Sequence, residues 1–394
     1  MEATQEKLWN RDYNKVMFIN FALYFSFYLL TPLLPVYLSE HFDASKDMIG
    51  LVLSGYTVAA LFVRPFSGYF VDSFNRKAVL LTCLALYTLI FASYLTASTL
   101  VLFAIVRTLH GGPYGASTVA NSTVAIDVLP SSRRSEGIGY YGLSNNIATA
   151  IAPTAGILIY KYIHNFDWLF VIAFATAAIG FAVAGTINIP EKAVVKNKQP
   201  LSLDRFFLTK GWMIGINIAF FGFCYGLLSN YLAIYSKERL GAVNGTGTFF
   251  LLLSIGLILS RLQGSKSLKE GKLAKNAALG IIISTIGYFV FVAFPSMPGY
   301  YATALLIGLG NGHLYPAFQN MMIDVAHHNE RGTANSTLLT SWDLGFGIGI
   351  LLGGVVAEFA GYDAAFWMNC CVHVIGLILF FTITRAFFER RRLA

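Results

Sequence analysis

Five ionisable residues lie most clearly within long apolar runs of the sequence, where a charged side chain is costly unless it faces protein or water. They are Arg107, His110, His313, Asp343 and His373. A buried carboxylate or an imidazole can gain and lose a proton when its surroundings change. We therefore predict proton coupling at Asp343, the only acidic residue well inside an apolar run, with His313 or His110 as relay or alternative.

These residues also have structural interpretations. Asp343 could form a permanent ion pair with Arg107, and His110 and His313 could be hydrogen-bonded packing residues. The four cysteines fall in apolar runs without metal-ligand spacing, so a packing role is favoured for them. We expect no metal, no cofactor and no enzymatic activity, because the sequence has neither a nucleophile triad nor a phosphate-binding loop.

Polar and aromatic residues recur in four apolar runs at spacings near i, i+4 and i+8, which places each set on one helix face. They are Asn20, Tyr24 and Tyr28; Arg107, Gly111 and Tyr114; Asn217, Phe221 and Tyr225; and Asn311, Tyr315 and Gln319. The alternative surrounding in a membrane is lipid, so we expect these faces to point toward water. Such a surface, positive at Arg107, suits a neutral or anionic solute better than a lipophilic cation.

The composition indicates what kind of element carries these residues. Of the 394 residues, 56% are hydrophobic and only 12% are charged, against roughly 25% charged in soluble domains. A helix of about 20 apolar residues crosses a bilayer. Runs of about that length occur at 16–38, 48–71, 78–96, 99–127, 137–160, 167–187, 211–235, 247–262, 276–294, 300–322, 333–357 and 365–385. The sequence thus predicts an all-α membrane protein with twelve transmembrane helices.

The distribution of Lys and Arg predicts the orientation of these helices. If the N-terminus is inside, most of the 28 basic residues fall in interior segments, and only Lys46, Lys161, Lys237 and Arg239 fall in exterior ones. This asymmetry places both termini in the cytoplasm. The basic residues do not gather on one globular face, so the net charge of +8 does not predict a nucleic-acid partner.

The two halves of the sequence are related by an internal repeat. A shift of 197 residues aligns Asn20 with Asn217, Tyr28 with Tyr225, Arg64 with Arg261, and Ile126-Asp127-Val128 with Ile323-Asp324-Val325. Each copy contains six runs, an even number, so both copies start on the same side of the membrane. We predict an N-terminal half at 1–187, a basic cytoplasmic linker at 188–210 and a C-terminal half at 211–394, related by an axis along the membrane normal.

Three motifs resemble a known family. The segment Gly68-Tyr-Phe-Val-Asp72-Ser-Phe-Asn-Arg76-Lys77 resembles the G-x-x-x-D-x-x-x-R-K/R loop of the major facilitator superfamily. Arg107-Thr-Leu-His110-Gly111 resembles the R-x-x-Q-G pattern of its proton-driven exporters, with His in place of the usual Gln. Ala152-Pro-Thr-Ala-Gly156 is a loose form of their G-P-x-x-G element.

The resemblance implies roles for several residues. Helices one, four, seven and ten line the substrate cavity in this family, so the four polar faces are assigned to it, with Asn145, Asn146 and Trp342 completing the wall. His373 lies on the peripheral last helix, where a core role is favoured. Asp72, Arg76 and Asp127 are expected to latch the halves in the outward-open state, the alternative being a topological anchor. The wider gating set is Gly68, Lys77, Arg134, Arg261, Asp324 and Arg331. In the second copy of the repeat, Lys269 occupies the position that corresponds to Asp72, so we expect the latch of the second half to be degraded.

The resemblance implies a secondary active transporter that exports a small organic solute by proton-coupled alternating access. The alternatives are a proton symporter or facilitator that imports a sugar or organic acid, and, more remotely, a non-transporting membrane receptor. We expect the partners to be a small-molecule substrate, protons and the lipid bilayer, and the protein to be monomeric. Its expected location is the cytoplasmic (inner) membrane of a bacterium.

Overall fold

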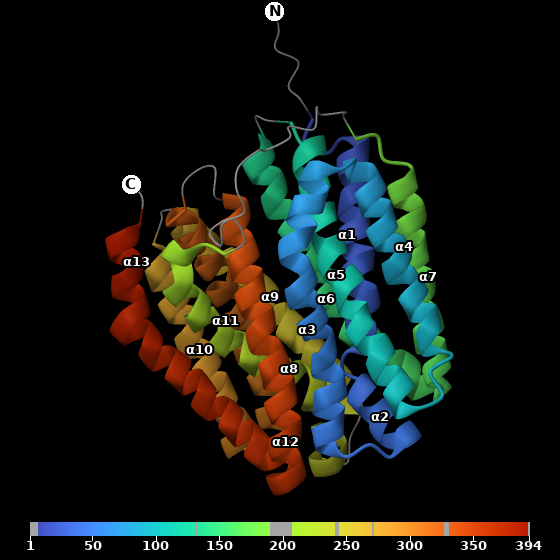
Figure 1. The fold of residues 1–394 in the computed structure, drawn as a ribbon. Coiled ribbons are helices and arrows are strands. Elements are labelled where there is room, and N and C mark those ends of the chain that lie inside the picture. The colour runs from blue at the N-terminus through green and yellow to red at the C-terminus, as the bar shows by residue number, and fades with distance from the viewer. Residues whose placement is uncertain are drawn as a thin grey trace, which may run out of the picture. The chain divides into compact units, whose positions relative to one another are not determined.

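A computed structural model describes residues 7–130, 133–189, 207–240, 244–269, 272–326 and 331–392, although some side chains within these ranges are not described. The described residues form helices and no strand, so the all-α prediction is confirmed (Figure 1). The helices of the first half are α1 (Arg11–Leu30), α2 (Leu34–Phe42), α3 (Lys46–Ser73), α4 (Arg76–Tyr94), α5 (Leu100–Val128), α6 (Arg134–Ile163) and α7 (Phe166–Gly185). The second half contains the 3₁₀ turn η3 (Thr209–Gly211), α8 (Trp212–Leu240), α9 (Asn244–Lys269), α10 (Leu273–Ala293), α11 (Met297–Asp324), α12 (Arg331–Leu379), the π-helix η5 (Phe380–Thr384) and α13 (Arg385–Arg391).

The observed helices differ from the predicted runs at two places. The first run is bent by 41° between α1 and α2, where Pro32 follows Thr31. The last two runs form the single element α12, whose two legs diverge from Gly361 (Figure 1). Gly361 has φ of 81°, a left-handed conformation that favours glycine and allows the chain to reverse between the legs.

By length and hydropathy alone, six of the described helices can cross a membrane, or seven with the bent pair α1–α2. Helices such as α5 and α11 do not qualify, because residues such as Arg107, His110 and Asn311 lower their mean hydropathy. The polar residues that lower the mean hydropathy of these helices are among the residues predicted to have a function.

Short polar residues start several helices. Asn10 accepts a hydrogen bond from the Tyr13 N–H at 2.8 Å, and Asn75 accepts one from Ala78 at 3.1 Å. Each bond satisfies a backbone donor that has no partner within the helix, which fixes where α1 and α4 begin.

The chain divides into two compact units. Unit 1 contains Met1–Thr31 and Ala59–Gln199, and unit 2 contains Pro32–Val58 and Pro200–Ala394. The unit boundary therefore passes through α3, and the segment 32–58 packs with the second half of the chain.

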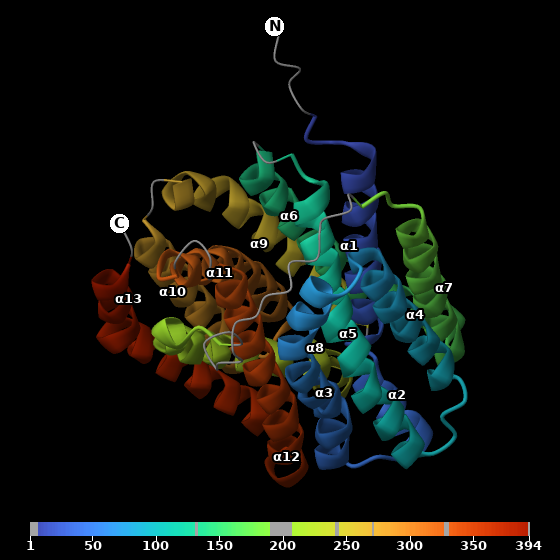
Figure 2. The same cartoon turned by 45° about the horizontal axis from the view of Figure 1, so that its top comes forward.

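The helix pairing within each unit follows the sequence repeat. In unit 1, α1 packs on α6 and α7, and α4 packs on α5 and α7; Figures 1 and 2 both show α4 and α7 side by side. In unit 2, α8 packs on α12, and α10 packs on α11 and α12. These are the same neighbours once α12 is counted as two legs, so the repeat seen in the sequence is also a repeat of packing.

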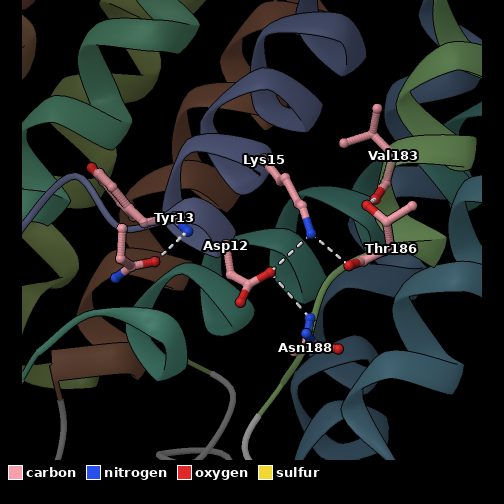
Figure 3. Close-up of polar contacts among 7 residues, drawn as sticks. Asp12, Tyr13, Lys15, Val183, Thr186 and Asn188 are labelled. Carbon is pink, nitrogen blue, oxygen red and sulfur yellow. Dashed lines mark hydrogen bonds and ion pairs between the residues drawn. The ribbon is translucent and has the colours of Figure 1, made fainter.

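Polar contacts fix the start of α1 to the end of α7 (Figure 3). Lys15 Nζ lies 3.1 Å from Asp12 Oδ1 and donates to the Thr186 carbonyl at 2.6 Å. The Asn188 N–H donates to the same Asp12 oxygen at 3.2 Å. The first and sixth spans of unit 1 therefore form one rigid corner, against which the site residues of α1 are positioned.

Candidate functional site

Arg107 lies in α5 at the centre of a polar and aromatic cluster in unit 1. Its side chain is 1% exposed, and its guanidinium lies 5.0 Å from the centre of the Phe27 ring, a cation–π contact between α5 and α1. The Arg107 charge also interacts with the hydroxyl of Tyr94, at the end of α4. Side chains of α1, α4 and α5 thus surround the Arg107 guanidinium.

His110 occupies the next turn of α5 and contacts the same tyrosine. Its Nδ1 lies 2.9 Å from the Tyr94 hydroxyl, and its ring packs against Phe91 and Tyr87 with ring centres 4.7 and 5.0 Å away. His110 is fully buried, and its Nε2 has no hydrogen-bond partner among the described residues. Arg107, Tyr94 and His110 form a continuous polar chain, which we call the α4–α5 triad.

The predicted aromatic face of α1 lies beside this triad. Tyr24 stacks on Tyr28 at 6.4 Å and contacts Tyr114 of α5 at 6.1 Å. Tyr114 in turn stacks on Phe27 at 4.3 Å. Through Phe27, the structure therefore brings together Tyr24, Tyr28, Arg107 and Tyr114, all predicted from helical spacing; Gly111 is buried on the same helix as Arg107.

Asn20 forms hydrogen bonds between two helices. Its amide donates to Ser144 Oγ at 2.8 Å and to the Tyr141 carbonyl at 3.2 Å, and the residue is fully buried between α1 and α6. Nearby, Asn121 donates to the Tyr141 hydroxyl at 3.0 Å. Asn145 is half-buried on α6, and the Asn146 side chain lies outside the described residues. Asn121 and Tyr141 complete this network, and the sequence reasoning missed both. Helical spacing could have found them, because Asn121 lies seven residues after Tyr114 and Tyr141 four residues before Asn145.

Unit 2 holds a second aromatic cluster. Trp342 on α12 packs between Tyr225 of α8 and Tyr315 of α11, with ring centres 5.9 and 5.2 Å away. Asp343 follows Trp342 and is half-buried, and Gln319 is half-buried one turn beyond Tyr315. Residues from three helices predicted to share a polar surface are thus clustered in this unit.

Other predicted residues of unit 2 hydrogen-bond or pack between helices. Asn217 donates to the Gly376 carbonyl at 2.9 Å, and Asn311 accepts from Ser284 at 3.4 Å. Phe221 packs against Phe318 and His373. Helical spacing identified these positions, but it does not distinguish a face toward substrate from a face toward a neighbouring helix.

The remaining two histidines lie within the helix packing of unit 2. His313 Nδ1 lies 3.0 Å from Asn276 Oδ1, and the Asn276 amide donates to the His313 carbonyl at 3.1 Å, so α10 and α11 are bonded reciprocally. His373 Nδ1 lies 2.9 Å from Thr285 Oγ1, and the residue is 1% exposed. Both rings are hydrogen-bonded to side chains of a neighbouring helix.

Two of the residues assigned to the latch form an ion pair within unit 1. Arg76, at the start of α4, forms an ion pair with Asp127 in the last turn of α5, and the Asp127 side chain is 3% exposed. Lys77 is half-buried beside it. In unit 2, Asp324 pairs with Arg392 at 3.2 Å. The side chains of the other latch residues, Gly68, Asp72, Arg134, Arg261 and Arg331, lie outside the described residues.

A charged cluster around the α2–α3 turn was not predicted. Glu40 pairs with Lys237, Lys46 Nζ lies 3.4 Å from Glu238, and the Lys46 N–H donates to Glu358 at 2.8 Å. Beside it, Asp47 accepts hydrogen bonds from the Ser45 hydroxyl and, at 2.8 Å, from the Met48 N–H. We call this set the α3-start cluster; all its residues belong to unit 2. The signal available in the sequence was the opposite charge of residues at the ends of separate apolar runs.

No group of three or more His, Cys, Asp or Glu side chains among the described residues is arranged to hold a metal ion, and the four cysteines are free thiols. The chemistry that the cluster residues themselves offer is proton transfer, hydrogen bonding, cation–π contact and ion pairing.

Sequence comparison relates the chain to known transporters. A sequence model of the Major Facilitator Superfamily matches residues 16–272 and 273–392. The staphylopine export protein of Staphylococcus aureus is 23% identical over 348 residues, 85% of this chain and 86% of that protein. The quinolone resistance protein NorA, also of Staphylococcus aureus, is 23% identical over 382 residues, 91% of this chain and 95% of that protein.

Solved structures share the fold. The inward-facing, occupied form of a bacterial homolog of the human lysosomal transporter Spinster has a TM-score of 0.80 at 13% identity, covering 97% of this chain and 98% of that one. The human organic anion transporter MFSD10 has a TM-score of 0.72 at 17% identity, covering 94% and 99%. Together with the helix pairing, these likenesses confirm the predicted fold of twelve helices in two repeats.

Proposed function

The chain belongs to the major facilitator superfamily, and from this premise we propose that it exports a small organic solute by proton-coupled alternating access. Membership makes it an integral membrane protein of a transporter family, with efflux transporters among its relatives. The direction of transport, the coupling to protons and the class of solute belong to the proposal. In it the chain works as a monomer in a bacterial cytoplasmic membrane, with both termini inside.

The α4–α5 triad is the observation that supports this function best. A buried guanidinium at Arg107 attracts an anionic or electron-rich group, while His110, linked to it through Tyr94, can take up or release a proton. In the proposal a donor group of the solute bonds His110 Nε2, which has no hydrogen-bond partner among the described residues and is also the atom that would take up the proton. The solute and the proton would therefore compete at the triad, which is the relationship an exchanger of protons for solute needs.

Asp343 is the proposed coupling acid of unit 2, with His313 as a further candidate. Asp343 lies beside Trp342, whose ring contacts Tyr225 and Tyr315. A carboxylate beside an aromatic cluster can change charge when a solute excludes water from it. Its protonation is the proposed counterpart, in unit 2, of the step at His110.

The proposed solute is neutral or anionic, amphipathic or polyhydroxylated. Arg107 provides the charge, and Tyr24, Tyr28 and Tyr114 provide hydroxyl groups and ring faces. Small organic molecules appear in the names of two relatives, one an export protein for staphylopine and one a quinolone resistance protein. A structural neighbour is named an organic anion transporter.

The test starts from purified full-length protein. A thermal-shift screen of organic anions, sugars and organic cations identifies a solute that stabilises the folded state. Proteoliposomes are then given a pH gradient of either sign and offered that solute outside. An exchanger accumulates solute when the interior is acidic, because protons leave as solute enters. Accumulation only with an acidic exterior indicates a symporter, and no accumulation in either case indicates a facilitator; both outcomes overturn the proposal.

A further inference from the structure

A shallow groove of about 410 Å³ runs along the last helical turns of the chain. It is lined by two rows of residues, each spaced i, i+4, i+8: Thr382, Ala386 and Arg390; Ile383, Phe387 and Arg391. The rows begin in η5 and end in α13. One end of the groove is therefore mostly apolar, and the other end is lined by two arginines.

The two groove arginines differ from their neighbours in how their charges are balanced. Arg385 pairs with Glu389 at 3.0 Å, and Arg392 pairs with Asp324 at 3.2 Å. Arg390 and Arg391 have no ion pair among the described residues; Arg391 donates to the neutral carbonyl of Lys210 at 3.3 Å. The groove thus ends in two positive charges that no carboxylate of the described chain neutralises.

The apolar end lies where a membrane span meets its surface. Ile383 is 46% exposed on the outside of the helix, as expected of a side chain that faces lipid. Phe387 contacts Trp212, whose ring is 44% exposed at the start of α8. Tryptophan is enriched at the level of the lipid headgroups. The groove therefore runs from acyl-chain depth at Ile383 to headgroup depth at Arg390.

We propose that this groove binds one anionic phospholipid. Two guanidinium forks at Arg390 and Arg391 match the oxygens of a phosphodiester, and the net negative charge of the lipid compensates their charge. An acyl chain lies against Ile383, Ala386 and Phe387, where it covers exposed apolar surface. Zwitterionic lipids offer the same chains but no net charge, so the groove selects the anionic class.

The local geometry supports a built site. Phe380–Thr384 form a π-helical segment, and such segments recur at functional positions because the extra residue widens the helix. Thr382 and Ile383 belong to this widened turn. The Arg391 guanidinium also lies 4.5 Å from the Phe387 ring centre, which holds it over the apolar wall while it contacts Lys210. A lipid here would hold the end of the chain against the start of α8.

The binding test uses full-length protein in detergent, with native mass spectrometry and thermal unfolding as readouts. Phosphatidylglycerol is expected to bind and to raise the melting temperature more than phosphatidylcholine does. A basic residue near an anionic surface contributes about fivefold in affinity, so the double variant Arg390→Gln/Arg391→Gln should bind phosphatidylglycerol about thirtyfold more weakly. Arg385→Gln, on the same helix but outside the groove, should bind it as the unchanged protein does.

Two further arms test whether the groove itself and the acyl chains are needed for binding. Ala386→Trp fills the groove without changing its charge and should also lose phosphatidylglycerol binding. Glycerol phosphate, the headgroup without chains, should not reproduce the stabilisation. Equal stabilisation by phosphatidylcholine, an equal loss in Arg385→Gln, full binding by Ala386→Trp, or an equal effect of glycerol phosphate would each overturn the proposal. None of these readouts depends on transport, so failure here leaves the proposed function untouched.

Discussion

Arg392 Nε lies 3.2 Å from Asp324 Oδ2, in an ion pair with the last residue of α11. Asp324 is the repeat-related counterpart of Asp127, which pairs with Arg76 at the start of α4. Position 273 in the repeat, which corresponds to Arg76, is a leucine. The two repeat-related aspartates are therefore each paired with an arginine, but the arginines come from different positions of the repeat. Only Arg76 belongs to the family's loop motif.

Replacement of Arg76 by glutamine should slow transport and lower stability. It removes the Arg76 charge from the nearly buried Asp127 carboxylate, at a cost of about 2 kcal/mol. If this pair belongs to a latch that is made and broken in the transport cycle, the turnover rate in proteoliposomes falls by about tenfold or more, since ~1.4 kcal/mol corresponds to tenfold. Lys77→Gln, one residue further along the same motif, should change both quantities much less. Unchanged turnover in Arg76→Gln would show that the pair is only an anchor.

Much of the fold could be predicted because a membrane leaves few choices. Apolar runs specify helices, and matches such as Arg64 with Arg261 reveal the repeat. The helix break after Thr31 depends on Pro32 and Pro35, which were visible in the sequence. The assignment of 32–58 to unit 2 was not predictable, because local sequence does not encode which distant helix a segment packs against.

The candidate site was predictable as a set of residues but less so as a set of roles. Spacing found Arg107 and His110, yet Tyr94, which joins them, lies on another helix and has no motif. Asn20 and Asn217 lie on the predicted faces but bond to neighbouring helices within their units. Helical phase gives a direction from the axis, and only the tertiary packing decides what lies in that direction.

His110→Gln should separate proton coupling from solute binding. Glutamine keeps a polar group near Tyr94 but cannot take up a proton at physiological pH. Solute binding, measured by thermal shift, should change by less than about threefold, or ~0.6 kcal/mol. Proton release on solute addition, followed with a pH-sensitive dye in weakly buffered detergent solution, should be lost. His164→Asn is the matched control, because His164 is exposed after α6 and its left-handed backbone suits asparagine. Retained proton release in His110→Gln would remove His110 from the coupling role.

Glu358→Gln should destabilise the start of α3. The Glu358 carboxylate accepts the Lys46 N–H at 2.8 Å, so it caps the first backbone donor of α3 and places negative charge at the positive end of the helix dipole. Glutamine can still accept the bond but has no charge, so we expect a loss of about 0.5–1 kcal/mol that shrinks at high salt. Glu389→Gln removes an exposed helix-surface pair with Arg385 and should cost at most about 0.5 kcal/mol. Thermal unfolding at low and high salt measures both variants, and equal losses at both salt concentrations would contradict the dipole argument.

Gly354→Ala should lower the stability of unit 2 by overfilling a crossing between two helix backbones. A methyl group at Gly354 on α12 would lie 2.8 Å from both the Gly50 Cα and the Tyr231 hydroxyl, and it would also meet the Lys46 carbonyl. Tyr231 cannot simply move away, because its hydroxyl donates to the Ile350 carbonyl at 2.8 Å. The two backbones would have to separate, at a cost of about 1–3 kcal/mol.

Gly142→Ala on α6 provides the matched control for this substitution. A methyl group at Gly142 has nothing described within 4 Å, so the alanine should only favour the helix, by up to about 1 kcal/mol. Thermal unfolding of the two purified variants should therefore shift in opposite directions from the unchanged protein. Equal melting temperatures for Gly354→Ala and Gly142→Ala would mean that α3 and α12 do not meet at Gly50 and Gly354, and the packing of 32–58 within unit 2 would have to be revised.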